Sequence, residues 1–266
     1  MISGHTKTLV ILADPVAHVR TPEALNARMS EAGIDAVMVP AEVAPGDLAA
    51  TVEGLRSIRN LAGLVVTVPH KTAMPALCDS LSQRAEIASS VNVVRRGADG
   101  RLHGDLLDGE GFMRGLSSTG TEISGKRIFL AGAGGAASAI AFSLAARGPA
   151  CLTVANRSRA KAQDLVTRLT RAFPGLEAAV GDGPTGHDLA INGTSLGLKP
   201  EDPLPFEPAE LLAGATVAEV IMQPETTALL DRAQELGLGT HAGRHMLDGQ
   251  LAEMMDFLLT SGDPQI

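Results

Sequence analysis

The sequence predicts an α/β protein built from two α/β domains, and three observations carry this prediction. Over the first hundred residues, short apolar runs alternate with helix-like segments, which is typical of βαβ units and of a mostly parallel sheet. After residue 108 the alternation starts again, around a glycine-rich turn of the type found in Rossmann domains. The length of 266 residues is sufficient for two modest domains, each with its own core.

The first hundred residues are predicted to form three strands and two helices, followed by a hairpin. Pro22 in the first turn and Gly33 after the end mark the boundaries of one helix. Ala98-Asp99-Gly100 is a hairpin-turn sequence between two apolar runs. The predicted strands are residues 7–13, 36–40, 63–68, 90–95 and 101–104, and the predicted helices are residues 21–32 and 48–57.

A second unit is predicted to open near Asp108 with the same alternation of strands and helices. Its last segment, residues 246–259, is an apolar helix that need not belong to the second sheet. The predicted strands are residues 126–131, 151–155, 189–192 and 216–220, and the other predicted helices are residues 136–147, 159–173 and 226–236.

The composition is that of a globular protein, with 45% hydrophobic and 20% charged residues. A formal net charge of −8 argues against a nucleic-acid partner, because a polyanion needs a basic surface. The chain also has no Trp and no Tyr, so it offers few of the aromatic platforms on which single-stranded bases stack. A local basic pocket for one phosphate remains compatible with this charge.

No segment predicts export or membrane insertion. The apolar run of residues 8–13 is too short and too lightly flanked for a signal peptide. The longest uncharged stretch, residues 128–146, is interrupted by glycines. Cys78 and Cys151 have no zinc-ligand spacing and are expected to be small buried residues. We therefore expect a cytoplasmic protein without a membrane partner.

Residues 128–131 form an apolar run that leads into Gly132-Ala133-Gly134-Gly135-Ala136-Ala137, a G-x-G-x-x-A fingerprint. Gly132 permits a tight turn, Gly134 lets the backbone approach a pyrophosphate, and Ala137 is small enough for close helix–strand packing. The N-terminus of the following helix supplies amide donors and a positive dipole. The motif alone also occurs in tight turns without ligands, but its place between a predicted strand and a predicted helix favours nucleotide binding.

The end of the next predicted strand indicates which dinucleotide binds. It carries Asn156, Arg157 and Ser158, with Lys161 soon after, whereas an NAD site typically has Asp or Glu there for the ribose 2′-hydroxyl. An arginine, a hydroxyl and a lysine suit a 2′-phosphate, so we expect NADP. The alternative is a helix N-terminus with ordinary surface charges.

Two further segments carry ionisable groups at exposed ends of predicted elements. Lys71 follows an apolar strand that closes with Pro69, and ligands of parallel sheets bind beyond the carboxyl ends of strands. Asp108 lies at the predicted junction of the two domains, where a cleft is the usual binding site. A lysine beside an aspartate can polarise a carbonyl and deliver a proton. Spacing alone favours a surface lysine and a turn aspartate over a catalytic pair.

A set of short motifs follows one another along the chain, and in this order they resemble the shikimate dehydrogenase family over nearly its whole length. The motifs are Asp14-Pro15-Val16-Ala17-His18-Val19-Arg20-Thr21-Pro22 ahead of Asn26, Val66-Thr67-Val68-Pro69-His70-Lys71, Ser90-Val91-Asn92, the segment from Gly104 to Phe112, Gly132 to Ala137, Asn156-Arg157-Ser158, Asn192-Gly193-Thr194-Ser195-Leu196-Gly197, Pro224 with Thr227, and Gly243-Arg244-His245-Met246-Leu247 through Gln250.

The resemblance implies a substrate domain of residues 1–107 and 242–266, to which the C-terminal helix returns, and a Rossmann-type NADP domain of residues 108–241. It implies reversible hydride transfer between nicotinamide and the ring carbonyl of 3-dehydroshikimate or a relative, with Lys71 and Asp108 as the catalytic pair. The expected partner is a small-molecule carboxylate, and the expected state is a monomer or homodimer. The implied substrate contacts are Thr21, Thr67, Asn92 and Gln250, and the implied cofactor contacts are Gly132, Gly134, Gly135, Ala136, Ala137, Asn156, Arg157, Ser158, Lys161, Thr194, Ser195 and Gly243.

Several substrate-side positions depart from the family pattern, each by exchanging a hydrogen-bonding group for an apolar one. A family serine is Val19, while the second serine position keeps a hydroxyl as Thr21. The other apolar exchanges are Val65, Leu106, Leu107 and Met222. A lost hydrogen bond to a charged group costs about 1.5–3 kcal/mol, or more than tenfold in affinity. We hypothesise that Arg20 replaces the missing carboxylate contact, although it could equally be a solvent-facing arginine.

Two alternatives remain open at this point. The altered residues favour another hydroxy or amino ring acid as substrate. The other alternative is a regulatory NADP-binding homologue without turnover. Retention of both Lys71 and Asp108 argues against the regulatory alternative, since a binding module needs neither. His241 and His245 are four residues apart, but Gly243 lies between them and no third ligand is evident, so we expect no metal.

Overall fold

A computed structural model describes residues 2–17 and 19–259 of the chain. The chain divides into two compact units, one made of residues 1–107 and the chain from residue 251 onward, the other of residues 108–250. The last boundary lies nine residues later than the predicted division at residue 242. His18 of the quoted loop and residues 260–266 of the predicted substrate domain lie outside the described residues.

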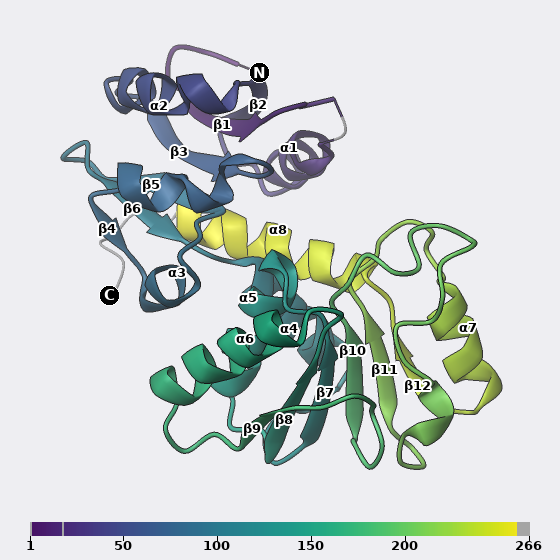
Figure 1. The fold of residues 1–266 in the computed structure, drawn as a ribbon. Helices are drawn as coiled ribbons and strands as arrows, with labels where there is room; N and C mark the ends of the chain where they lie inside the picture. The colour runs from purple at the N-terminus through teal and green to yellow at the C-terminus, as the bar shows by residue number, and fades with distance from the viewer. Residues whose placement is uncertain (1, 18, 260–266) are drawn as a thin grey trace. The chain divides into compact units, whose positions relative to one another are not determined.

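The first unit is built on a six-stranded sheet. Its elements are β1 (Lys7–Ala13), α1 (Thr21–Glu31), β2 (Ala36–Glu42), α2 (Leu48–Arg56), β3 (Leu61–Val66), β4 (Ser80–Leu81), α3 (Gln83–Ala88), β5 (Val93–Arg96) and β6 (Leu102–Asp105). The strand order is β2-β1-β3-β5-β6-β4, and α1 packs on β2 (Figure 1). Only β5 runs against its neighbours, because it forms the predicted hairpin with β6. The sheet is therefore mostly parallel, as predicted.

Strand β3 ends two residues before the predicted end at residue 68. Thr67 still donates its backbone N–H to the carbonyl oxygen of Leu12 at 3.1 Å, but Val68 is 61% exposed. The next residue, Pro69, has no N–H with which to continue a ladder. The chain therefore leaves the sheet at this point and carries Lys71 beyond the strand end.

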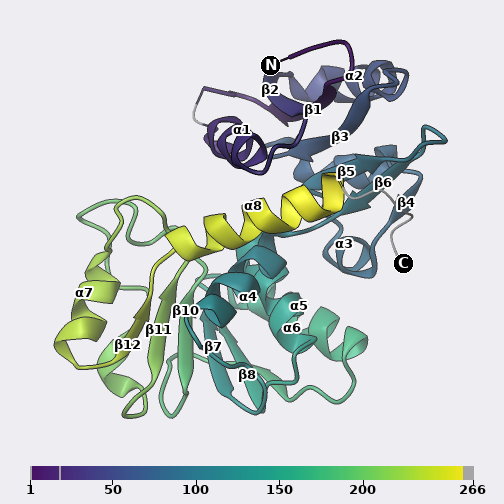
Figure 2. The same cartoon turned by 180° about the vertical axis from the view of Figure 1, so that it is seen from behind.

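The second unit is a six-stranded, wholly parallel sheet with the order β12-β11-β10-β7-β8-β9 (Figures 1 and 2). The chain runs outward from β7 to β9 and then returns to β10 on the other side of β7, as in a Rossmann domain. Its elements are α4 (Asp108–Ser118), β7 (Arg127–Ala131), α5 (Gly135–Ala145), β8 (Cys151–Ala155), α6 (Arg159–Ala172), β9 (Ala178–Val180), β10 (Leu189–Asn192), β11 (Thr216–Glu219), α7 (Ala228–Glu235), β12 (Gly239–His241) and the first residues of α8 (Arg244–Leu259).

One face of the second sheet is covered by α7 and a long connection. Phe129 of β7 packs edge-on against Phe206, with ring centroids 5.4 Å apart. Leu229 and Leu230 of α7 complete this cluster with the small strand residue Ala190. Burial of this apolar surface stabilises the sheet whose strand ends carry the predicted nucleotide site. No helix within residues 2–17 and 19–259 is long and apolar enough to cross a bilayer.

Helix α4 was not predicted, because three glycines interrupt its sequence and glycine is a poor helix former. The structure shows what these glycines do. A Cβ on Gly109 would lie 2.3 Å from the carbonyl oxygen of Ala139 in α5, and a Cβ on Gly111 would lie 2.8 Å from the backbone of Gln250. Glycine thus permits α4 to approach both α5 and the start of α8. This packing explains why residues 242–250 belong to the second unit.

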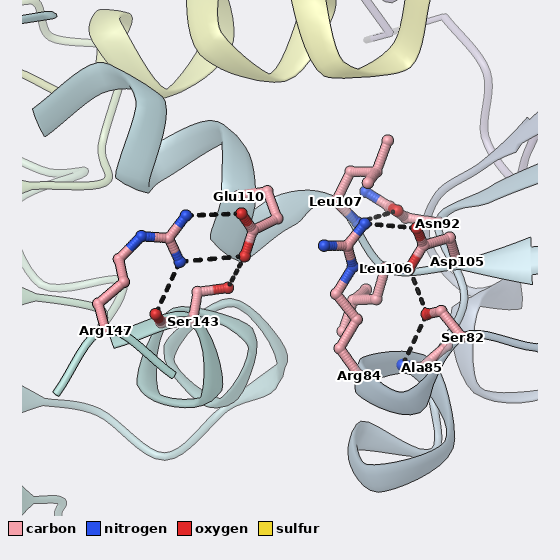
Figure 3. A network of polar contacts seen from close by, with 10 residues as sticks. All are labelled: Ser82, Arg84, Ala85, Asn92, Asp105, Leu106, Leu107, Glu110, Ser143 and Arg147. Carbon is pink, nitrogen blue, oxygen red and sulfur yellow. Dashed lines mark hydrogen bonds and ion pairs between the residues drawn. The ribbon is translucent and has the colours of Figure 1, made fainter. Parts of the chain in front are cut away.

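Polar contacts add to the close packing of α4 on α5. Glu110 accepts hydrogen bonds from the Ser143 hydroxyl at 2.7 Å and from Arg147 Nη2 at 2.7 Å (Figure 3). Both partners lie on or just after α5, so this carboxylate fixes α4 against that helix. The first residue of α4 is Asp108, whose position is therefore set by packing along the whole helix.

We expect Gly109→Ala to lower the free energy of unfolding by about 1–3 kcal/mol, because the added methyl group has no space against the α5 backbone. Urea unfolding followed by circular dichroism measures this loss. Gly54→Ala is the matched control, since Gly54 lies within α2 and no atom lies within 4 Å of an added Cβ. That control should gain about 0.5–1 kcal/mol from helix propensity. Equal stabilities for Gly109→Ala and the wild type would contradict the packing argument.

Candidate active site

A cavity of about 660 Å³ lies at the carboxyl ends of β7, β8 and β10 in the second unit. Strand order reverses between β7 and β10, and ligands of open parallel sheets bind at such a reversal. The volume is within the range of small-molecule and cofactor sites. The predicted cofactor residues that line the cavity are Gly132, Gly134, Asn156, Arg157, Ser158, Lys161, Thr194 and Ser195.

The glycine-rich turn between β7 and α5 has the backbone geometry that the fingerprint predicts. Gly132 has a φ of +115°, and a Cβ there would lie 2.8 Å from the carbonyl oxygen of Gly193. Gly134 precedes the first residue of α5, and an added Cβ would have no atom within 4 Å. Ala137 is fully buried and lies against Gly193. The helix N-terminus therefore faces open space in which an anionic group can reach the backbone amides.

A second wall of the cavity, formed by the turn after β8, is basic. Arg157 and Lys161 are exposed and line the cavity together with the Ser158 hydroxyl. Asn156 Nδ2 donates to the Ser158 carbonyl oxygen at 3.0 Å and so shapes the turn after β8. Two cations, a hydroxyl and the glycine-rich turn line the same cavity, and this set fits a dinucleotide that carries an extra phosphate.

The third wall is the turn of residues 193–196 after β10. Asn192 is fully buried, and its Oδ1 accepts from the Thr194 N–H at 3.0 Å and from the Thr194 hydroxyl at 2.7 Å. The Thr194 hydroxyl in turn accepts from the Leu196 N–H at 3.0 Å. The Thr194 hydroxyl therefore donates its hydrogen bond to Asn192 and stabilises the turn. Ser195 is exposed and lines the cavity.

Some predicted cofactor residues lie away from the cavity lining, and some lining residues were not predicted. Gly243 packs against the Ile221 carbonyl oxygen, which would lie 2.2 Å from an added Cβ. Asp182 lines the cavity and pairs with Arg159 at 3.0 Å. Asp182 follows β9, a three-residue strand that was not predicted. A prediction of β9 would have indicated Asp182, because it lies just beyond the carboxyl end of that strand. The other predicted residues outside the lining are Gly135, Ala136 and Ala137.

In the first unit, backbone hydrogen bonds place Thr67, Lys71 and Asn92 at neighbouring strand ends. The Val66 N–H donates to the Asn92 carbonyl oxygen at 2.8 Å, and the Val91 N–H donates to the Lys71 carbonyl oxygen at 2.9 Å. These bonds join the segment after β3 to the start of β5. Three of the residues implicated in substrate binding and catalysis therefore lie where β3 ends and β5 begins, at the same end of two neighbouring strands.

The segment that leads to Asp108 is held by two buried side chains of the first unit. Asn92 is 1% exposed, and its Oδ1 accepts from the Leu107 N–H at 2.8 Å. Asp105 accepts from Arg84 Nε at 2.7 Å and from the Leu106 N–H at 2.7 Å, and it also binds the Ser82 hydroxyl (Figure 3). The two backbone amides ahead of Asp108 are thus fixed, and the Arg84–Asp105 pair was not predicted.

In the second unit, Asp108 is the first residue of α4 and is only 6% exposed. Gln250 Nε2 donates to Asp108 Oδ1 at 2.5 Å. The structure therefore brings together a residue implicated in catalysis and one implicated in substrate binding, although they are separated by most of the second unit in sequence.

Arg20 and Thr21 lie at the start of α1. Arg20 has an exposed side chain, and its Nη1 lies 3.7 Å from Glu23 Oε2. An exposed pair at this distance contributes little to stability, so the guanidinium is available to another anion. Thr21 is half-buried as the first residue of the helix.

Four of the five apolar exchanges fall into two groups, and the fifth, Val19, is half-buried. Leu106 and Leu107 are 4% and 1% exposed, and Val65 is 2% exposed, so these side chains are part of the core of the first unit. Met222 is 39% exposed instead. Burial of the first group stabilises the fold of the first unit.

His241 and His245 form no metal site with a third ligand among residues 2–17 and 19–259. His241 is 1% exposed, and its Nδ1 lies 3.1 Å from the Thr119 hydroxyl. Its ring packs edge-on against Phe112 and lies 4.8 Å from the ring of His245. Burial, with a smaller contribution from His245, lowers the pKa of His241 from 6.5 to about 4.

We expect this depressed pKa to make the protein less stable in acid. Below pH 6.5 the unfolded chain binds a proton at His241 that the folded chain does not bind until about pH 4. Between pH 7 and 4.5 this linkage removes about 2 kcal/mol of the free energy of unfolding. Urea unfolding at both pH values should show a smaller pH dependence in His241→Gln than in the wild type. Equal pH dependence in the two proteins would contradict this assignment.

Two family descriptions match this chain. Residues 11–94 match the shikimate dehydrogenase substrate binding domain, and residues 116–178 match shikimate / quinate 5-dehydrogenase. The chain is 38% identical over 255 residues to the shikimate dehydrogenase (NADP(+)) of Rubrobacter xylanophilus, covering 92% of this chain and 88% of that one.

Solved structures with the same fold include enzymes with different names. Shikimate 5-dehydrogenase from Listeria monocytogenes, in complex with shikimate and NAD, is 31% identical with a TM-score of 0.91, over 99% of this chain and 95% of that one. The ligand-free 5-ketofructose reductase of Gluconobacter sp. strain CHM43 is 33% identical with a TM-score of 0.90, over 97% and 94%.

Proposed function

Because the chain belongs to the shikimate dehydrogenase family, we propose that it is an NADP-dependent oxidoreductase that interconverts 3-dehydroshikimate and shikimate, or a related quinate-type ring acid. The observation that carries this proposal is the match along more than nine-tenths of the chain to a shikimate dehydrogenase (NADP(+)). The dinucleotide cavity and the bonded Asp108–Gln250 pair support it independently.

The cofactor would be held by the walls of the cavity in the second unit. The amides after Gly134 would bind the pyrophosphate, and Arg157, Ser158 and Lys161 would bind the 2′-phosphate. When bound, NADP(H) accepts or supplies the hydride at its nicotinamide ring. The chain's own contribution is to orient the dinucleotide and to exclude NAD, which lacks the phosphate that these cations bind.

Lys71 and Asp108 would take part in the proton transfer that accompanies hydride transfer. In reduction, the Lys71 ammonium would donate a proton to the substrate oxygen as negative charge develops there. In oxidation, the same nitrogen would take the hydroxyl proton back. Asp108 would be the second member of the catalytic pair that the family resemblance implies, and Gln250 fixes its carboxylate through the hydrogen bond to Oδ1. Thr67 and Asn92 would bind substrate hydroxyls.

A second candidate function is reduction of a neutral ketose. Two observations favour it: a serine hydroxyl of the family pattern is lost at Val19, and the similarity to 5-ketofructose reductase is comparable to that to the shikimate enzyme. A substrate without a carboxylate needs no serine hydroxyl at position 19. Catalysis by Lys71 and Asp108 would be the same, because the reacting group is again a carbonyl.

Steady-state assays that follow reduced nicotinamide test the proposal. Shikimate and quinate would be oxidised with NADP⁺ and with NAD⁺, and 5-ketofructose would be reduced with NADPH. We expect turnover of shikimate or quinate, with NADP⁺ preferred. Turnover of the ketose alone would replace the proposal with the second candidate. Failure of all three substrates, while NADPH still binds, would refute both.

If the substrate is a carboxylate, we expect Arg20→Ala to raise its KM about threefold to tenfold, because an exposed guanidinium contributes less than a buried one. The value of kcat should change little, since Arg20 would bind the acid and not the reacting carbonyl. Arg28→Ala, on the same helix, is the matched control. An unchanged KM for every carboxylate substrate would remove Arg20 from the site.

The proposal includes a cytoplasmic location and a monomeric or homodimeric state. The thiols of Cys78 and Cys151, both unpaired, suit a reducing compartment. Size-exclusion chromatography with light scattering distinguishes the two oligomeric states.

A further inference from the structure

At the end of β11, next to the turn that forms the third wall of the dinucleotide cavity, Glu219 is completely buried. Buried carboxylates are rare because removing the charge from water is costly unless hydrogen bonds replace the lost solvation. Burial raises the pKa of the Glu219 carboxyl, and the surrounding donors oppose that rise. A group of this kind in a sheet core needs an explanation beyond packing.

All the partners of Glu219 are neutral donors. The Val220 and Ile221 N–H groups donate to its Oε1 at 2.9 and 3.1 Å, and the Thr227 hydroxyl donates to its Oε2 at 3.0 Å. Asn192 Nδ2 lies 3.0 Å from both oxygens. Because every neighbour donates, an acceptor-only carboxylate satisfies the site and an amide cannot do so fully.

Asn192 connects this carboxylate to the cavity. It lies opposite Glu219 in the β10–β11 ladder. While its Nδ2 binds Glu219 and the Leu196 carbonyl oxygen, its Oδ1 holds the N–H and hydroxyl of Thr194. The carboxylate thereby selects the orientation of the Asn192 amide, because the reverse orientation would place Oδ1 against it.

The turn so held also abuts the glycine-rich turn. A Cβ added to Gly132 would lie 2.8 Å from the carbonyl oxygen of Gly193, so the two turns are in close contact. A change in the conformation after Asn192 would therefore move both the third wall and the turn that faces the pyrophosphate.

We propose that Glu219 is a positioning residue for the dinucleotide site, which sets the turn of residues 193–196 by fixing the side-chain orientation of Asn192. The inference rests on the proposed binding of NADPH in this cavity. It assigns Glu219 no contact with the cofactor and no part in proton transfer. Its loss should therefore weaken NADPH binding much more than it changes KM for the second substrate.

The experiment measures the Kd of NADPH from the change in its fluorescence on binding, and it requires no turnover. The chain has no Trp and no Tyr, so the protein background is low. We expect Glu219→Gln to weaken binding about tenfold, and Asn192→Asp, which sets two carboxylates against each other, to weaken it at least as much. The double variant restores the donor–acceptor pair between positions 192 and 219, but the Leu196 carbonyl oxygen loses its donor, so NADPH should bind more tightly than to Asn192→Asp and less tightly than to the wild type.

Asp188→Asn is the matched control. Asp188 lies just before the other end of β10, where its carboxylate accepts from the Arg127 N–H at 2.8 Å. The Kd of NADPH for Asp188→Asn should remain within about twofold of the wild-type value. A wild-type protein that does not bind NADPH would refute the proposed function; normal binding by folded Glu219→Gln, or no recovery in the double variant, would overturn the inference alone.

A second pair of variants covers the case in which Glu219→Gln does not fold. Asn192→Ala and Thr227→Val each remove a side-chain donor from the carboxylate, but only Asn192 joins it to the turn. We expect about tenfold weaker NADPH binding in Asn192→Ala and less than threefold in Thr227→Val. Equal effects of the two substitutions would show that the network serves stability only and would overturn the inference.

Discussion

Replacing Lys71 by alanine is expected to lower kcat about 10²- to 10⁴-fold, the range associated with loss of a general acid–base group. Lys71 follows the carboxyl end of β3, and its backbone carbonyl oxygen accepts a hydrogen bond from Val91, the residue before Asn92. The cavity that would bind NADPH is lined by residues of the second unit alone. The Kd of NADPH in Lys71→Ala should therefore stay within about twofold of the wild type.

Lys7→Ala is the matched control for this prediction. Lys7 is an exposed lysine at the start of β1, in the same unit as Lys71 but at the opposite end of the strand from the site. It should retain wild-type kcat and KM. Steady-state assays with the best substrate, together with NADPH fluorescence titrations, measure both quantities. If Lys71→Ala turns over at the wild-type rate, Lys71 has no part in the chemistry.

Replacing Arg157 by alanine is expected to raise the KM for NADPH roughly ten- to hundredfold and to leave the KM for NADH nearly unchanged. Arg157 lines the basic wall of the cavity, and no acid occupies the strand end at Asn156. A charge-assisted hydrogen bond to phosphate contributes about 1.5–3 kcal/mol, which corresponds to this change. Only NADPH carries the phosphate, so the effect should be specific to it.

The control for the arginine substitution is Arg168→Ala. Arg168 lies on α6, as Lys161 does, but pairs with Asp164 at 2.9 Å on the helix surface. Removal of the Arg168 side chain should change the KM for NADPH and the KM for NADH by the same small factor. A parallel loss of NADPH and NADH affinity in Arg157→Ala would contradict the 2′-phosphate assignment. Lys161→Ala should show the same cofactor specificity as Arg157→Ala, with a smaller effect, because a lysine binds phosphate as a point charge.

Local sequence patterns predicted most of the strands and helices, since apolar periodicity and proline or glycine punctuation act over a few residues. Strands β1, β8 and β10 have their predicted bounds. The glycine-rich turn was also predictable, because a strand, a tight turn and a helix follow one another directly. The elements missed are short, as β4 and β9 are, or contain residues that oppose their own conformation, as α4 does.

The candidate site was predictable only where it lies at strand ends along the chain. Lys71, Asn156 and Arg157 follow strands whose apolar runs are evident in the sequence. The Asp108–Gln250 hydrogen bond and the Glu219–Asn192 network join residues that are 142 and 27 positions apart. No local pattern specifies such pairs.

The sequence by itself therefore determined the α/β class, the parallel second sheet and the place of the dinucleotide turn, because each depends on neighbouring residues. Only the tertiary structure decided that the glycines of α4 permit close helix packing, that Leu106 and Leu107 enter the core, and that Glu219 is buried among donors. These features depend on which distant segments lie in contact. Close packing and the pairing of every buried polar group arise only when those segments meet.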